Sequence, residues 1–156
     1  MEIAGIGVKL LQMAERKEIK EKHGVIFVIF DGKKIQLEKR SEEKDKYCGF
    51  TFIPGGKVEA GEAPLDALIR EVKEEYCVTA EVFKQLGTIS GVEAETGLPA
   101  FHHIFMVSKW GGNLSNPEDR NVHLEATIEE AREICQHPVS QKVIDLVEAE
   151  LFGQNS

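Results

Sequence analysis

Residues 56–78, GKVEAGEAPLDALIREVKEEYCV, join a glycine-rich loop to the clearest helix signal in the chain. Pro64 stands where the first turn of a helix tolerates proline, and apolar side chains follow it at helical spacing. These side chains are Leu65, Leu68, Ile69, Val72 and Tyr76. The segment therefore predicts a loop followed by an amphipathic helix whose apolar stripe packs on the protein core.

Three glutamates gather on one flank of this helix in projection: Glu71, Glu74 and Glu75. Such close carboxylates repel one another, and near the C-terminal end of a helix the macrodipole disfavours each by a few tenths to about 1 kcal/mol. A hard divalent cation such as Mg²⁺ or Mn²⁺ prefers oxygen ligands and offsets both costs. Arg70 can pair with Glu74 at the next turn. Taken alone, the acidic flank is more typical of a solvated helix face.

The whole segment resembles the box of the Nudix hydrolase family, which includes the MutT-like enzymes: G-x5-E-x7-R-E-U-x-E-E-x-G-U, with U a bulky aliphatic residue. The positions that match in register are Gly56, Glu62, Arg70, Glu71, Val72, Glu74, Glu75 and Val78. Cys77 departs from the pattern because the family has glycine there. Glycine suits a left-handed helix ending that costs other residues roughly 1 kcal/mol or more. We therefore expect an altered helix exit and an intact site.

The resemblance implies an α/β fold, an α/β/α sandwich with a mixed sheet in which the box is a loop-helix-loop. It also implies a pyrophosphatase, a hydrolase of nucleoside diphosphates linked to a second moiety, such as nucleoside triphosphates or nucleotide sugars. The implied ligands of Mg²⁺ or Mn²⁺ are Glu71, Glu74, Glu75 and the Gly55 carbonyl. The implied role of Glu62 and Arg70 is to orient the loop and the helix.

The reaction that the resemblance implies needs a carboxylate to accept a proton from the attacking water. Glu71 is the first choice for this base and Glu74 the second, with Arg70 completing the catalytic set. In some relatives a downstream loop supplies the base, and Glu118, Asp119 and Glu125 stay open alternatives for that role.

Strand signals surround the box on both sides. Residues 25–30 are a β-branched and aromatic run, and the Asp31-Gly32 pair before the alternating Ile35 and Leu37 predicts a hairpin. Further strands are expected at residues 50–53, 78–83 and 101–107. Strands interspersed with helices favour a mixed α/β domain, and we expect residues 1–156 to form one domain.

Helix signals lie at both ends of the chain. Residues 1–22 contain apolar positions at helical spacing, which predicts an N-terminal helical extension that either assists homodimer formation or covers a sheet edge. Residues 127–130 have a capping-box pattern that opens a short helix, which His137-Pro138 should end. Ser140 is expected to cap a last helix.

Substrate contacts are harder to predict. Lys39 and Arg40, which follow the first hairpin, are candidates for binding substrate phosphate, although a surface role is more typical of such residues. His102 and His103 are adjacent on an expected strand and so point to opposite faces, which prevents both from binding one metal ion. Four aromatic residues are candidates for base stacking or for the core: Tyr47, Phe50, Phe101 and Trp110.

The composition limits the classes of partner. The 27 acidic and 19 basic residues give a net charge of −8, which disfavours long nucleic acids and RNA caps and leaves a small nucleotide as the expected substrate. No run suggests a signal peptide or a membrane span, and three scattered cysteines suggest neither disulfides nor zinc, so we expect a cytoplasmic protein. The alternative is a catalytically silent, nucleotide-binding regulatory module, but such modules usually lack box carboxylates that are all present here.

Overall fold

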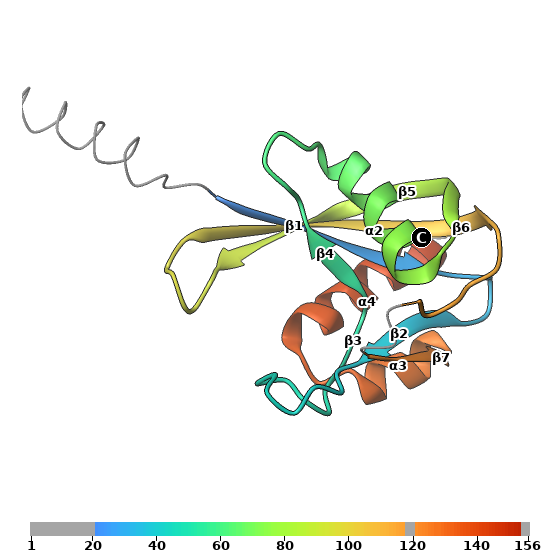
Figure 1. Cartoon of the computed structure of the whole chain (residues 1–156). Helices are drawn as coiled ribbons and strands as arrows, with labels where there is room; N and C mark the ends of the chain where they lie inside the picture. The colour runs from blue at the N-terminus through green and yellow to red at the C-terminus, as the bar shows by residue number, and fades with distance from the viewer. Residues whose placement is uncertain (1–20, 118–120, 154–156) are drawn as a thin grey trace, which may run out of the picture.

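The computed structural model describes residues 21–117 and 121–153. The strands within this part of the chain are β1 Lys22–Ile29, β2 Ile35–Lys39, β3 Thr51–Phe52, β4 Gly55–Lys57, β5 Thr79–Val92, β6 Pro99–Gly111 and β7 Val122–Ala126 (Figure 1). The helices are α2 Pro64–Tyr76, α3 Ile128–Ile134 and α4 Pro138–Phe152. The strands form a first sheet of order β4-β1-β6-β5 and a second sheet of order β3-β2-β7.

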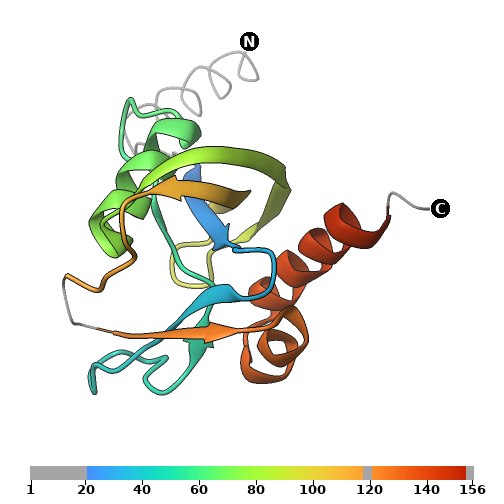
Figure 2. The same ribbon diagram turned by 90° about the vertical axis from the view of Figure 1, so that its right-hand side faces the viewer.

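The first sheet is mixed and lies between helices. β1 pairs in parallel with β6 and antiparallel with β4, and β5 pairs antiparallel with β6. Alternate residues of a strand point to opposite faces. Phe27 accordingly packs with Leu68 and Val72 of α2, and Val28 packs with Ile144 of α4. Figure 2 shows α2 in green and α4 in red on opposite sides of these strands. The predicted α/β/α sandwich with a mixed sheet is confirmed.

The second sheet has one apolar and one polar face. Leu37 of β2 and Ala126 of β7 are buried in the core that α3 and α4 share. On the opposite face, Glu38 lies directly across from His123 in the antiparallel β2–β7 pair. This polar face is the part of the second sheet that matters for the site, because a polar cavity forms over it. The sequence pattern did not lead us to expect β7.

The predicted hairpin between residues 25 and 37 is wrong. The chain turns at Gly32, whose φ is +96°, but β1 and β2 then join different sheets. Only one isolated bridge, between Phe30 and Ile35, links the two segments in the described structure. The Asp-Gly turn signal was sound, but the burial of both neighbouring strands on two separate sheets outweighs the local preference for pairing across a turn.

The C-terminal helices confirm one prediction and correct another. Thr127 and Glu130 form the expected capping box, with Oγ1 of Thr127 3.1 Å from the Glu130 nitrogen. Ser140 does not cap α4, because Pro138 already occupies the first turn and Nδ1 of His137 accepts a hydrogen bond from the Val139 nitrogen at 3.2 Å. Ser140 is instead buried within that turn.

The apolar stripe of α2 is narrower than predicted. Leu68, Val72 and Tyr76 are fully buried, whereas Leu65 is 43% and Ile69 36% exposed. The helix packs on the first sheet through a narrow face, so side chains at the edges of the apolar stripe remain exposed to solvent.

Some predictions fall on residues outside the described structure. The N-terminal helical extension lies there apart from its last two residues, and Lys22 belongs to β1. Glu118 and Asp119, two alternatives for the base, also lie outside the described residues. In the described parts of the chain, no helix combines the length and apolar character needed to cross a membrane.

Candidate functional site

Two glycines bring the box loop into close contact with its neighbours. A Cβ on Gly56 would lie 2.1 Å from Cδ of Glu71, and one on Gly55 would lie 2.4 Å from the carbonyl oxygen of Val25. A side chain at Gly55 would therefore force the backbone to move, and one at Gly56 would displace the Glu71 carboxylate. The pairing of β4 with β1 fixes this loop, and the Glu71 carboxylate lies directly against it.

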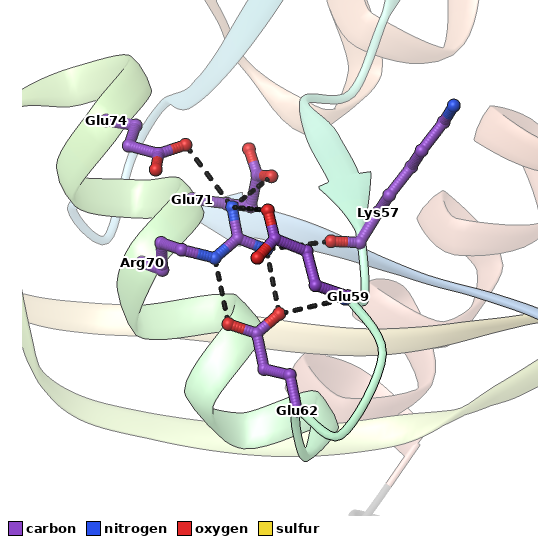
Figure 3. Close-up of polar contacts among 6 residues, drawn as sticks. All are labelled: Lys57, Glu59, Glu62, Arg70, Glu71 and Glu74. Carbon is purple, nitrogen blue, oxygen red and sulfur yellow. Dashed lines mark hydrogen bonds and ion pairs between the residues drawn. The ribbon is translucent and has the colours of Figure 1, made fainter.

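Arg70 holds the loop and the helix together (Figure 3). Its Nε and Nη2 each donate to one oxygen of Glu62 at 2.8 Å, and Nη2 also donates to the Lys57 carbonyl at 2.9 Å. Nη1 donates to Glu71 at 2.8 Å and to Glu74 at 3.3 Å. The predicted pair with Glu74 is present, but the two-pronged contact with Glu62 is the shorter and more specific one.

This network separates the acidities of its carboxyl groups. The hydrogen bonds from Arg70, and then from the Glu59 backbone nitrogen, lower the pKa of Glu62 to about 2. Burial raises the pKa of Glu71 above its ordinary value, although Arg70 opposes this effect. The Glu62 contact raises the pKa of Arg70, which stays positively charged. Glu62 is thus a fixed anion that anchors Arg70, and Glu71 is the carboxylate whose charge the site disfavours.

A polar cavity of about 210 Å³ lies between the C-terminal turns of α2 and the polar face of the second sheet. We call it the acidic cavity, and its lining residues are Glu38, Arg40, Glu42, Asp45, Gly55, Glu75, Asn116, Asn121 and His123. Among the described lining residues, four carboxylates and one guanidinium leave a net charge of −3 when the histidine is neutral. Such a cavity repels phosphate unless a cation is also bound.

The structure divides the predicted site residues into two groups. Gly55 and Glu75 line the acidic cavity, whereas Glu71 and Glu74 converge on Nη1 of Arg70. Within the described residues, no three acidic, histidine or cysteine side chains stand close enough together to hold a metal ion. The ligand set Glu71, Glu74, Glu75 and Gly55 therefore stays a prediction.

The other candidates from the sequence also have definite places. Arg40 lines the acidic cavity, whereas Lys39, at the end of β2, is exposed. Glu125 is exposed on β7, where it accepts a hydrogen bond from Gln36 at 3.1 Å. Of the two residues suggested for phosphate, only Arg40 lies at the cavity.

The chemistry of the donors fits a divalent cation. The Glu71 carboxylate lies against Gly56, next in sequence to Gly55, and it shares Nη1 of Arg70 with Glu74. The carboxylates of Glu71, Glu74 and Glu75 and the Gly55 carbonyl offer the hard oxygen atoms that Mg²⁺ or Mn²⁺ prefers. A cation would compete only with Nη1 for the carboxylates of Glu71 and Glu74, because Nε and Nη2 remain bound to Glu62 and the Lys57 carbonyl.

The residues that form the sheet side of the acidic cavity were not among those predicted from the sequence. Glu38 is 8% exposed and accepts a hydrogen bond from Asn121, and the His123 ring stacks on Tyr76 with 4.3 Å between ring centroids. Burial lowers the pKa of His123. The signal was the alternation of IQLEK at 35–39 and VHLEA at 122–126, which places Glu38 on the polar face of one strand and His123 on the polar face of the other.

The expectation that Cys77 alters the C-terminal end of α2 is wrong. Cys77 keeps the left-handed conformation that suits glycine, with φ 61° and ψ 26°, and its nitrogen donates to the Lys73 carbonyl at 3.0 Å. It is the only residue other than glycine with a positive φ in the described structure. The fixed positions of α2 and the following chain outweigh the roughly 1 kcal/mol cost of this conformation.

The Nudix domain profile matches residues 20–147, which is most of the chain. The chain belongs to the Nudix family. Over 92 residues it is 33% identical to an ADP-ribose pyrophosphatase of Methanocaldococcus jannaschii, a match that covers 59% of this chain and 53% of that protein. The chain spans about half the length of the curated relatives that it matches. The predicted family membership is therefore confirmed.

Solved structures support the fold of this Nudix domain. A MutT structure described for Aliivibrio salmonicida and Vibrio cholerae is 26% identical, has a TM-score of 0.70, and covers 84% of this chain and 99% of its own. The Escherichia coli ORF135 protein is 24% identical, with a TM-score of 0.76 and coverage of 90% and 97%. The second likeness shows the fold alone.

Proposed function

We propose that this Nudix protein is a pyrophosphohydrolase that depends on Mg²⁺ or Mn²⁺ and cleaves a phosphoanhydride bond in a nucleoside diphosphate linked to another moiety. The observation that carries the proposal is the acidic cavity, where Glu75 and Gly55 of the box region meet three further carboxylates. Its net charge of −3 would exclude a diphosphate in the absence of metal. The cavity is therefore suited to a metal complex of the substrate.

The metal, when bound, would neutralise phosphate charge and increase the acidity of water. Glu71, Glu74, Glu75 and the Gly55 carbonyl are the proposed ligands. Arg40, the only Lys or Arg among the described residues that line the acidic cavity, would orient a phosphate group. Lys39 is exposed, and we assign it no contact with the substrate.

Glu71 is the proposed general base, with Glu74 as the second choice. Glu71 is held between Gly56 and Arg70, so its carboxylate has little freedom to turn away from the loop. Its raised pKa makes it a stronger base than an ordinary glutamate. Arg70 would act as a positioning residue, because its guanidinium is bound to Glu62 and the Lys57 carbonyl rather than directed at the acidic cavity.

ADP-ribose is the first substrate to test. The support is the printed name of the Methanocaldococcus jannaschii relative, ADP-ribose pyrophosphatase, at 33% identity. Nucleoside triphosphates come second, because MutT is among the structural relatives. Both compounds contain a nucleoside joined to a phosphoanhydride, the unit that the proposed site recognises.

The test is release of nucleoside monophosphate from ADP-ribose, nucleoside triphosphates and nucleotide sugars, with Mg²⁺, with Mn²⁺ and with EDTA. The proposal expects release from at least one class of substrate with metal and none with EDTA. Nucleotide binding without release under any condition would overturn the hydrolase and support a regulatory binding module instead.

A further inference from the structure

A second cavity, of about 460 Å³, lies apart from the box. We call it the hairpin cavity, because the tip of the β5–β6 hairpin forms one side, and Figure 1 shows this hairpin extending beyond the body of the first sheet. The loop between β2 and β3 contributes Tyr47, the start of α4 contributes His137, and β6 contributes His102. The volume falls within the range of about 300–1,000 Å³ that is typical of small-molecule sites.

The walls of the hairpin cavity include an aromatic corner. The rings of Tyr47 and His137 lie with centroids 5.7 Å apart and planes at 87°. A flat ligand that stacks on one of these rings therefore meets the other ring edge-on, and both arrangements are favourable for aromatic groups. This geometry favours a planar ring over an aliphatic ligand.

Two histidines bring polar atoms to the same corner. Nδ1 of His137 accepts the hydrogen bond from the Val139 nitrogen, so the proton of the neutral ring lies on Nε2, which is then a donor. No side-chain hydrogen bond of His102 is found within the described residues. The cavity thus offers both donors and an acceptor to the edge of a planar ligand.

The charges of the hairpin cavity cancel. Lys46 and Lys142 are its basic residues, apart from the histidines, and Glu93 and Glu95 are its acidic ones. Lys46 is paired with Glu95 at 3.2 Å, and its Nζ lies 5.0 Å from the centre of the Tyr47 ring. Unlike the acidic cavity, this one carries no net charge, so it suits an uncharged aromatic group rather than phosphate.

The ring of Phe52 connects the two cavities. It contacts Arg40, whose Cζ lies 5.5 Å from the ring centre, and Arg40 lines the acidic cavity. It also contacts Tyr47 and His137 of the hairpin cavity, with centroid distances of 5.4 and 5.5 Å. One aromatic ring thus contacts residues of both cavities, which therefore lie near each other, as the phosphates and the base of one nucleotide do.

We propose that the hairpin cavity binds the nucleobase of the substrate, which stacks against Tyr47 and presents its polar edge to His102 and His137. This inference rests on the proposed function, because it assumes that the phosphates of the same molecule occupy the acidic cavity. The base would then be selected by residues that lie outside the Nudix box.

The first experiment measures binding without catalysis. Wild-type protein in EDTA is titrated with adenosine, guanosine, cytidine and uridine, and the ring resonances of His102 and His137 are followed by NMR, assigned with His102→Gln and His137→Gln. We expect at least one nucleoside to shift both resonances and ribose to shift neither. If all four nucleosides leave both rings unaffected, the inference is overturned, whether or not the protein hydrolyses nucleotides.

The second experiment separates the base from the phosphates. For Tyr47→Ala we expect an increase in KM of about 10-fold for the best nucleotide substrate, an unchanged kcat, and unchanged hydrolysis of the matching ribose 5-polyphosphate, which lacks the base. Tyr47→Phe keeps the ring and should behave like wild type, and Phe152→Ala, an exposed aromatic on α4, is the control. Equal kinetics for Tyr47→Ala and wild type would overturn the inference.

The two proposals fail in different ways. Histidine shifts with a nucleoside, but no metal-dependent release from any substrate, would reject the hydrolase and leave the nucleobase site. Metal-dependent release with no histidine shifts would reject the nucleobase site and leave the hydrolase.

Discussion

The acidic cavity and the hairpin cavity differ in charge and in origin. The first carries a net charge of −3 and includes Gly55 and Glu75 of the box region, whereas the second is neutral and contains no box residue. Both use the segment that follows β2, since Arg40 lines one and Tyr47 the other. The comparison shows that the segment after β2 contributes to two chemically different cavities. One is charged and suits metal and phosphate, and the other has an aromatic corner that suits a planar ring.

The largest effect is expected at Glu75, the box carboxylate of the acidic cavity. Glu75→Gln should lower metal-dependent kcat/KM on the order of 10²- to 10³-fold, because a charged oxygen facing metal and phosphate is lost. The nucleoside shifts of the hairpin cavity should remain. Steady-state kinetics checks the first point, with Glu133→Gln, at an exposed site on α3, as the control. Unchanged Mg²⁺-dependent turnover would remove Glu75 from the site.

The next largest effect is expected at Arg70, which positions the carboxylates of the box. Arg70→Lys cannot make the two-pronged contact with Glu62, so kcat/KM should fall roughly 10- to 100-fold. Arg132→Lys is the matched control, because Arg132 also pairs with two carboxylates, Asp145 and Glu148, but on α4. Equal losses in both variants would show a general effect of arginine replacement rather than positioning of the site.

A smaller effect is expected at Cys77, which ends α2 next to the acidic cavity. Cys77→Gly should raise the free energy of unfolding by about 1 kcal/mol, because glycine adopts the left-handed conformation at little cost. Activity should not change. Urea unfolding measures the gain, and Cys48→Gly, at an exposed position without positive φ, should show none. A loss of stability in Cys77→Gly would mean that the thiol makes contacts that outweigh the strain.

The smallest effect concerns acid, which should remove the contributions of His102 and Glu62 to stability one after the other. Burial lowers the pKa of His102 below 6.5, so the unfolded state binds more protons and stability falls as the pH drops below that value. Glu62 has its pKa lowered from 4.5 to about 2, so its contribution is lost only between those values. Urea unfolding across pH should show that His102→Gln weakens the first loss and Glu62→Gln the second. A single transition unchanged by either variant would contradict this order.

Several predictions made from the sequence alone depended on local spacing, and those are the ones that the structure confirms. Pro64 opens α2, the capping box of Thr127 opens α3, and Arg70 reaches Glu74 at the next turn. The family and its sandwich fold also followed from the box. The proposed metal ligands stay a prediction. Glu71 and Glu74 accept hydrogen bonds from Arg70, whereas Glu75 lines the acidic cavity.

The failed hairpin prediction depended on distant parts of the chain, because β1 and β2 found partners on different sheets. The other failures were local: Ser140 lost its capping role to His137, and Cys77 kept the left-handed conformation. Homodimer formation, a cytoplasmic location and a single domain over residues 1–156 stay predictions. Lys39 and Arg40 are adjacent in sequence, yet only Arg40 lines the acidic cavity, because neighbouring residues around a strand end point in different directions.

The sequence by itself determined the family and the acidic helix, because spacing along one helix fixes which side chains share a face. Only the tertiary structure decided that Glu38 and His123 complete the acidic cavity and that Tyr47, His102 and His137 share a second one. These residues come from segments far apart in the chain. Their meeting depends on how the two sheets and α4 pack, and no local pattern contains that information.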